Sequence, residues 1–254
     1  MRKNQKTLYH MVLTAIFSAL CFVGVNIRIP LPVGFVHLGN FICIMSALLC
    51  GGIVGGLSGS IGMGLFDLYY YGGFTAGVLR TIILKLGMGL IAGFVFQFFV
   101  KKNKNIKVWS FILLGVFFTG LIVSGIFSGI GGFDFFGKHI EIHYTVPLLL
   151  GIIVLMYICI VIFDKKLNDL AKVAMIATSF AVIFNLFGEI YIKALLYYWM
   201  EAKYATFEQA YIYSMSGIVS ASVTSVLTCI LSGIIFYPLY SSVKVFLKSN
   251  EKIA

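Results

Sequence analysis

Long apolar runs alternate with short polar ones along the whole chain. A helix needs about 20 apolar residues to cross a bilayer, and fewer where neighbouring helices shelter it. On that measure the pattern predicts about eight membrane-spanning helices joined by short turns. They cover residues 8–29, 36–51, 53–71, 78–100, 108–132, 147–163, 173–199 and 210–240. The predicted fold class is therefore all-α, a polytopic membrane helical bundle in a single domain that covers residues 1–254.

Composition also indicates a membrane protein. Apolar residues make up 60% of the 254 residues and charged residues 11%, and the mean hydropathy is +1.01, far from the values of soluble proteins. The net charge of +10 does not indicate nucleic-acid binding, because the basic residues fall in short blocks between apolar runs. The five cysteines form no CxxC pair, so neither a disulfide framework nor a zinc site is expected.

The basic blocks predict the orientation of the chain. When the eight segments alternate, 13 of the 19 Lys and Arg residues lie on the same side as both termini. The positive-inside rule makes that side cytoplasmic, and we expect a multi-pass protein of a bacterial or archaeal cell membrane. The blocks consist of Arg2, Lys3, Lys6, Lys101, Lys102, Lys104, Lys107, Lys165, Lys166, Lys172, Lys244, Lys248 and Lys252.

Small residues recur along the third predicted helix and indicate close packing. Two sets are spaced four residues apart: Gly51, Gly55 and Gly59, and Gly52, Gly56, Ser60 and Gly64. Two adjacent stripes of this helix therefore lack large side chains, and another helix backbone is expected to approach closely there.

Ionisable residues gather near the outer end of the predicted bundle, where a charge costs several kcal/mol unless it meets a partner, water or a ligand. Internal ion pairs are one explanation, between Asp67 and either Arg80 or Lys85, and between Glu189 and Lys193. We prefer a substrate pocket with flat aromatic walls for a planar or heterocyclic small molecule. Cations outnumber carboxylates there, which favours an acidic group on the ligand. The predicted ligand-binding residues are Arg28, Asp67, Arg80, Lys85, Asn185, Glu189, Lys193 and Trp199.

Catalytic motifs are largely absent from the sequence. It has no HExxH, GxSxG, Walker lysine loop or Rossmann fingerprint, and we expect neither enzymatic activity nor a cofactor. His139, Glu141 and His143 in the stretch HIEIH can bind a metal in principle, but so few ligands on one short loop favour an exposed polar loop. His10 and His37 lie at predicted helix ends, where interfacial hydrogen bonding is the preferred interpretation.

Four motifs follow one another along the chain: HLGN at 37–40, GLFDLYYYG at 64–72, TIILKLGMGLIAG at 81–93 and YPLY at 237–240. Together they resemble the S-components of energy-coupling factor (ECF) transporters, which capture vitamins and related micronutrients for an ATP-driven uptake complex. The resemblance implies a six-helix core, so that residues 108–163 would be an added helix pair. Asn40 stands where the family pattern has an acid.

The resemblance also implies partners. Ala15 and Ala19 match the small AxxxA motif that faces the membrane-embedded T-component in this family. Such a protein binds a vitamin-like ligand from outside and depends on the T-component and two ATPase subunits, because it has no nucleotide site. The alternative is a stand-alone ion-coupled secondary transporter that uses Asp67 or Glu189 as its ion site. The sequence does not identify the substrate.

Overall fold

The computed structural model describes residues 3–31, 34–101, 105–129, 133–135, 138–140 and 145–251. Nine helices and two short antiparallel hairpins make up these residues. The helices are Lys3–Asn26 (α1), Gly39–Cys50 (α2), Gly52–Tyr70 (α3), Ala76–Lys101 (α4), Ile106–Gly129 (α5), Thr145–Ile162 (α6), Asp169–Met200 (α7), Phe207–Ser216 (α8) and Ile218–Glu251 (α9). In the hairpins, Arg28–Pro30 (β1) pairs with Phe35–His37 (β2), and Phe133–Phe135 (β3) pairs with Lys138–Ile140 (β4).

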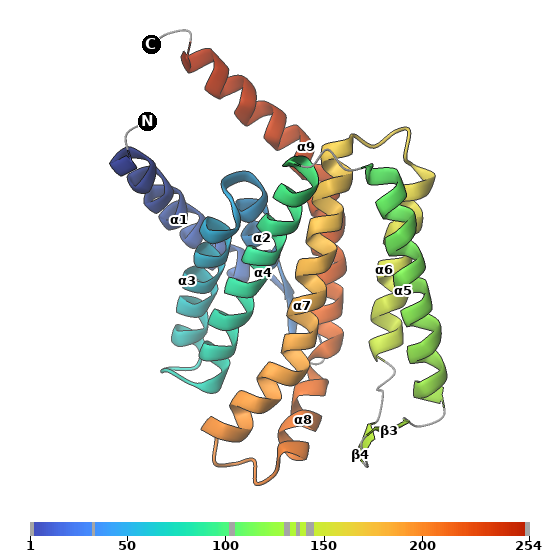
Figure 1. The fold of residues 1–254 in the computed structure, drawn as a ribbon. Helices are drawn as coiled ribbons and strands as arrows, with labels where there is room; N and C mark the ends of the chain where they lie inside the picture. Colours follow the sequence, from blue (N-terminus) through green and yellow to red (C-terminus); the bar gives the residue numbers. More distant parts are fainter. Residues whose placement is uncertain are drawn as a thin grey trace.

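The helices run up and down one bundle, and α1 begins at the same end at which α9 finishes (Figure 1). Among the described residues, α1, α4, α5, α7 and α9 are long and apolar enough to cross a membrane. The predicted fold class, an all-α polytopic membrane bundle, is therefore confirmed.

Eight crossings were predicted, whereas five of the described helices qualify as candidate spans, and two predicted segments need correction in their extent. The segment 36–51 contains β2 and a helix, α2, of only 12 residues, about 18 Å long against a hydrocarbon core of about 30 Å. The segment 210–240 is divided between α8 and α9 at Gly217, a residue type that disfavours helix continuation. The strands were not predicted either, because each has only three residues. The side chains of the HIEIH stretch lie outside the described residues.

The first small-residue stripe of α3 faces α2. A Cβ atom at Gly55 would overlap Ala47, and one at Gly59 would overlap the sulfur of Cys43. Gly51 alone separates the two helices, with a φ of 100° that favours glycine. The predicted turn and the close packing that follows it are both confirmed.

The second small-residue stripe of α3 faces α4, which contributes glycines of its own. A Cβ atom at Gly89 would overlap the backbone of Gly56, and one at Gly93 would overlap Gly52. Ser60 adds a hydrogen bond of 2.8 Å from its hydroxyl to a backbone carbonyl of α4. The backbones of α3 and α4 are therefore in direct contact along most of α3, which holds the residues at their ends in fixed positions.

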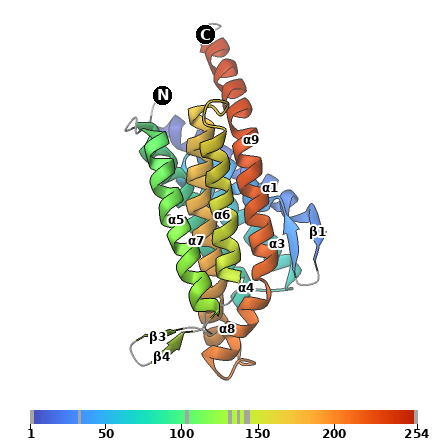
Figure 2. The ribbon, with the colours of Figure 1, turned by 90° about the vertical axis from the view of Figure 1, so that its right-hand side faces the viewer.

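The α5–α6 hairpin lies beside α7 and α9 (Figures 1 and 2). A charge cluster ties its end to α7: Lys172 Nζ donates to Asp164 Oδ1 at 2.6 Å and to Asp169 Oδ1 at 3.0 Å. Lys107 of α5 lies 3.8 Å from the other oxygen of Asp164. The hydrogen bond from Lys172 holds the pKa of Asp164 below its usual value. That residues 108–163 are an insertion stays a prediction.

Gly89→Ala tests the contact between α3 and α4. Because the new Cβ would overlap the backbone of Gly56, we expect the free energy of unfolding to fall by about 1–3 kcal/mol, the usual cost of overpacking. Gly115→Ala is the matched control, since a Cβ there meets nothing within 4 Å and alanine favours a helix. Thermal unfolding in detergent should give a lower melting temperature for the first variant only. Equal melting temperatures would contradict the packing described above.

Candidate functional site

A pocket of about 300 Å³ lies among α2, α3, α4, α7 and the α8–α9 junction, with the β1–β2 hairpin at its side. This volume is at the lower end of the range for small-molecule sites. Gly34 closes the hairpin with a φ of 83°, and a Cβ there would contact Ser220 of α9. Six of the predicted ligand-binding residues line the pocket: Asp67, Arg80, Lys85, Asn185, Glu189 and Lys193.

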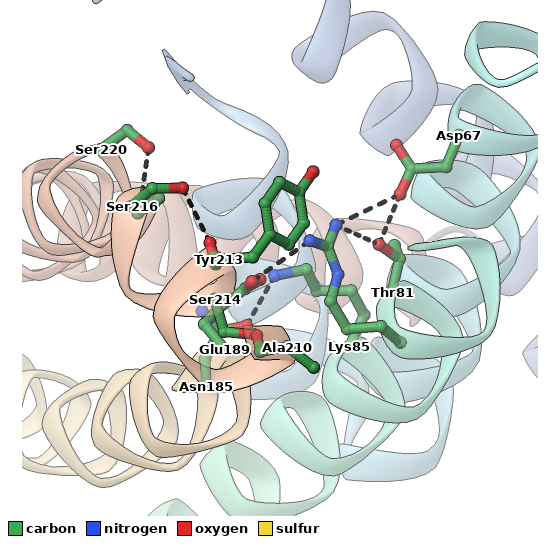
Figure 3. Close-up of polar contacts among 12 residues, drawn as sticks. Asp67, Thr81, Lys85, Asn185, Glu189, Ala210, Tyr213, Ser214, Ser216 and Ser220 are labelled. Atoms are coloured by element: carbon green, nitrogen blue, oxygen red, sulfur yellow. Dashed lines mark hydrogen bonds and ion pairs between the residues drawn. The ribbon is translucent and has the colours of Figure 1, made fainter. Parts of the chain in front are cut away.

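Arg80 lies between two carboxylates at the centre of this pocket. Its Nη2 is 3.6 Å from Asp67 Oδ2 and its Nη1 is 3.3 Å from Glu189 Oε2. The Thr81 hydroxyl accepts a hydrogen bond from Arg80 at 3.0 Å. It donates one to Asp67 (Figure 3). The network joins α3, α4 and α7. Of the internal ion pairs that the sequence left open as an alternative to a ligand pocket, the one between Asp67 and Arg80 is present. Glu189 pairs with Arg80 instead of Lys193.

Two lysines of the pocket have neutral partners. Lys85 Nζ donates to Asn185 Oδ1 at 2.6 Å (Figure 3), and Lys193 Nζ lies 4.8 Å from the ring centroid of Tyr213. In the part of the chain that the structure describes, neither ammonium group forms an ion pair. Both carboxylates of the pocket are paired to Arg80, so the pocket has an excess of positive charge. It suits a ligand with negative charge or strong hydrogen-bond acceptors.

Two buried polar atoms in the pocket have no hydrogen-bond partner among the described residues. They are Asn40 Oδ1 and Arg80 Nε, and Asn40 is only 3% exposed. An unsatisfied buried polar group costs about 1–3 kcal/mol. A ligand that offers one hydrogen-bond donor and one acceptor would remove both costs.

His37 is the last residue of β2, and its Nδ1 accepts a hydrogen bond of 3.1 Å from the backbone N–H of Gly39, the first residue of α2. The interfacial role expected for this histidine stays a prediction. His37 also lines the pocket, a role that was not predicted.

Small polar residues of α8 and α9 form another wall that was not predicted. Ser216, Ser220 and Thr224 line the pocket, and each donates its hydroxyl hydrogen to a carbonyl of its own segment. Their spacing of four residues within the apolar segment 210–240 was the available signal, because in one continuous helix it would place them on one face.

Two of the predicted ligand-binding residues, Arg28 and Trp199, do not line the pocket. The Arg28 guanidinium lies over the rings of Phe35 and Tyr70, at 5.1 and 5.6 Å from their centroids, and so contacts two residues of the pocket wall without lining the pocket itself. Trp199 is 71% exposed and lies outside the pocket. It lies six residues beyond Lys193, which lines the pocket, and therefore points to another side of α7. The structure does not bring Trp199 to the other predicted residues.

Ala15 and Ala19 lie on a different surface. Both are exposed on α1 and line an apolar groove of about 1140 Å³ bounded by α1, α3 and α4. Leu57, Ile61 and Leu65 of α3 form its opposite wall. Small side chains here leave room for another helix to approach α1.

The fold defines a polytopic helical membrane protein, and the pocket is an internal polar cavity within its bundle. Residues 5–130 match the sequence model of the family described as "ECF-type riboflavin transporter, S component". The chain belongs to the S components of ECF-type transporters, a class of transport proteins. The match includes α2, α3 and α4 of the pocket but not α7, α8 or α9.

One curated relative, an "Uncharacterized protein in gap 3'region" of Pyrococcus woesei, is 31% identical over 99 residues. The aligned part is 38% of this chain and 60% of the relative. No solved structure matches the chain.

Proposed function

We propose that this chain is the substrate-binding subunit of an ECF-type importer and that it captures riboflavin or a related flavin. The pocket carries the proposal, because residues with buried charges and unsatisfied polar atoms line a cavity with aromatic walls. The family description names riboflavin, whose planar ring system has one N–H donor between two carbonyl acceptors. Phe35, Tyr70 and Tyr213 offer flat walls to such a ring. Asn40 Oδ1 can accept the N–H, and Lys85 can donate to a carbonyl.

A titration with riboflavin, followed by quenching of flavin fluorescence, tests the site. We expect Arg80→Ala and Glu189→Gln to weaken binding about 10- to 100-fold, because a hydrogen bond to a charged group contributes about 1.5–3 kcal/mol. Glu201→Gln is the matched control: Glu201 directly follows α7, pairs with Lys203 at 3.1 Å and does not line the pocket.

Unchanged affinity in well-folded Arg80→Ala and Glu189→Gln proteins would remove these two residues from the site. If the unmodified protein did not bind riboflavin, the flavin proposal would be wrong. Mass spectrometry of small molecules retained on the purified protein would then identify the captured ligand.

Uptake is proposed to depend on a T-component and two ATPase subunits, with the T-component docked at Ala15 and Ala19. We expect Ala15→Trp and Ala19→Trp to leave riboflavin affinity unchanged but to abolish ATP-dependent uptake and weaken co-purification with the T-component. A bulky ring would hold the partner helix away from α1. Ile16→Trp is the control, because Ile16 is also exposed but does not line the groove.

Normal transport by both alanine variants, with the complex intact, would contradict this docking face. Uptake that survived ATP depletion but collapsed with the ion gradient would instead support the alternative, an ion-coupled secondary transporter.

Both termini are proposed to be cytoplasmic in a bacterial or archaeal cell membrane, which places the ligand pocket toward the outside. A membrane-impermeant thiol reagent applied to intact cells should label Lys203→Cys and leave Lys165→Cys unlabelled. Both side chains are exposed, in the α7–α8 loop and the α6–α7 turn respectively. The parent chain, which has its own cysteines, gives the background. Labelling at position 165 would reverse the orientation.

A further inference from the structure

A second apolar groove, of about 920 Å³, lies between α6, α7 and α9, where the α5–α6 hairpin meets the rest of the bundle. It is separate from the ligand pocket. Met156 of α6, Met175 of α7 and Ile230 and Ile234 of α9 are among its lining residues. Ile234 is 66% exposed, so the groove is open toward the surroundings of the bundle, which are lipid for a membrane-spanning protein.

Lys166 is the single charged residue among the described residues that line this groove, and it lies at one end. Lys166 and Asn168 of the α6–α7 turn line that end, and no carboxylate is among the described residues that line the groove. The nearby carboxylates of Asp164 and Asp169 are both bound to Lys172. The exposed Lys166 ammonium, 5.9 Å from the Phe163 ring centroid, is therefore available to an anionic group at the mouth of the groove.

The length of the groove corresponds to one leaflet of a bilayer. On α9 its lining runs from Ser225 to Pro238, about 20 Å at 1.5 Å per residue. Half of a hydrocarbon core of about 30 Å is about 15 Å. Tyr237 lies at the same end as Lys166, the level at which tyrosine and lysine side chains meet lipid headgroups. An acyl chain that starts beside Lys166 can therefore lie in the groove as far as the bilayer centre.

We propose that this groove binds one anionic phospholipid from the leaflet on the side of the chain termini. Its phosphate is held by Lys166, and its acyl chains fill the space between α6, α7 and α9. The groove is apolar over the length of one leaflet and has a single cation at one end. This arrangement matches an anionic lipid, whose phosphate would meet the cation. It does not match an apolar helix, which has no charge to place at that level. The lipid would join the α5–α6 hairpin to the bundle.

Native mass spectrometry of the full chain, titrated with phosphatidylglycerol or with phosphatidylcholine of the same acyl chains, tests this site. We expect one phosphatidylglycerol to be retained in preference to phosphatidylcholine. Lys166→Ala should weaken phosphatidylglycerol retention about fivefold, the effect of one lysine beside an anionic lipid. Lys165→Ala is the matched control, because Lys165 is an exposed neighbour that does not line the groove.

A second pair of variants tests the acyl part of the site. Val226→Trp places a ring inside the groove and should remove retention of both lipids, whereas Val223→Trp, at an exposed position of α9 outside the groove, should not. Equal losses in Lys165→Ala and Lys166→Ala would show diffuse surface attraction and overturn the proposal. So would undiminished retention in Val226→Trp, or a lipid-free dimer, which would assign the groove to a second copy of the chain.

Discussion

Three charges meet inside the bundle where Arg80 lies between Asp67 and Glu189. Each would be costly in a membrane without its partners, and one guanidinium can serve two carboxylates because it presents several N–H donors in a fixed plane. The three residues belong to α4, α3 and α7, so their pairing fixes these helices relative to one another. Loss of Arg80 would leave two buried carboxylates unpaired, a larger cost than the loss of either acid alone.

The glycine contact between α3 and α4 brings Asp67 and Thr81 close enough to form a hydrogen bond. Asp67 and Thr81 have short side chains, and they can bond directly only because the two backbones touch along the stripe that includes Gly56 and Gly89. Packing and electrostatics are therefore coupled. A larger residue at the glycine contact would separate the helices and lengthen the polar contacts at their ends, even though it lies away from the pocket.

The features that could be predicted are those that produce a regular spacing of residue types within one segment of the sequence. Small residues four apart predicted the contacts of α3. Five charged residues and one asparagine within apolar runs predicted six of the residues that line the pocket. Contacts between distant segments leave no such pattern. His37 and Asn40 reach the pocket beside a hairpin too short to predict, and the choice of Arg80 over Lys193 as the partner of Glu189 depends on how α4 and α7 meet.

The pocket is lined by residues from two parts of the chain, and only the first part matches the family model. Asp67, Arg80 and Lys85 lie within the matched residues 5–130, whereas Asn185 and Glu189 lie beyond them. A ligand in the cavity would contact both groups, since Arg80 is paired to Glu189 and Lys85 to Asn185. Under the proposed function, selectivity would therefore depend on the interface between the two parts. The family description refers to the first part alone. It would hold for the ligand of this chain only if the groups of the second part, such as Asn185 and Glu189, also fit that ligand.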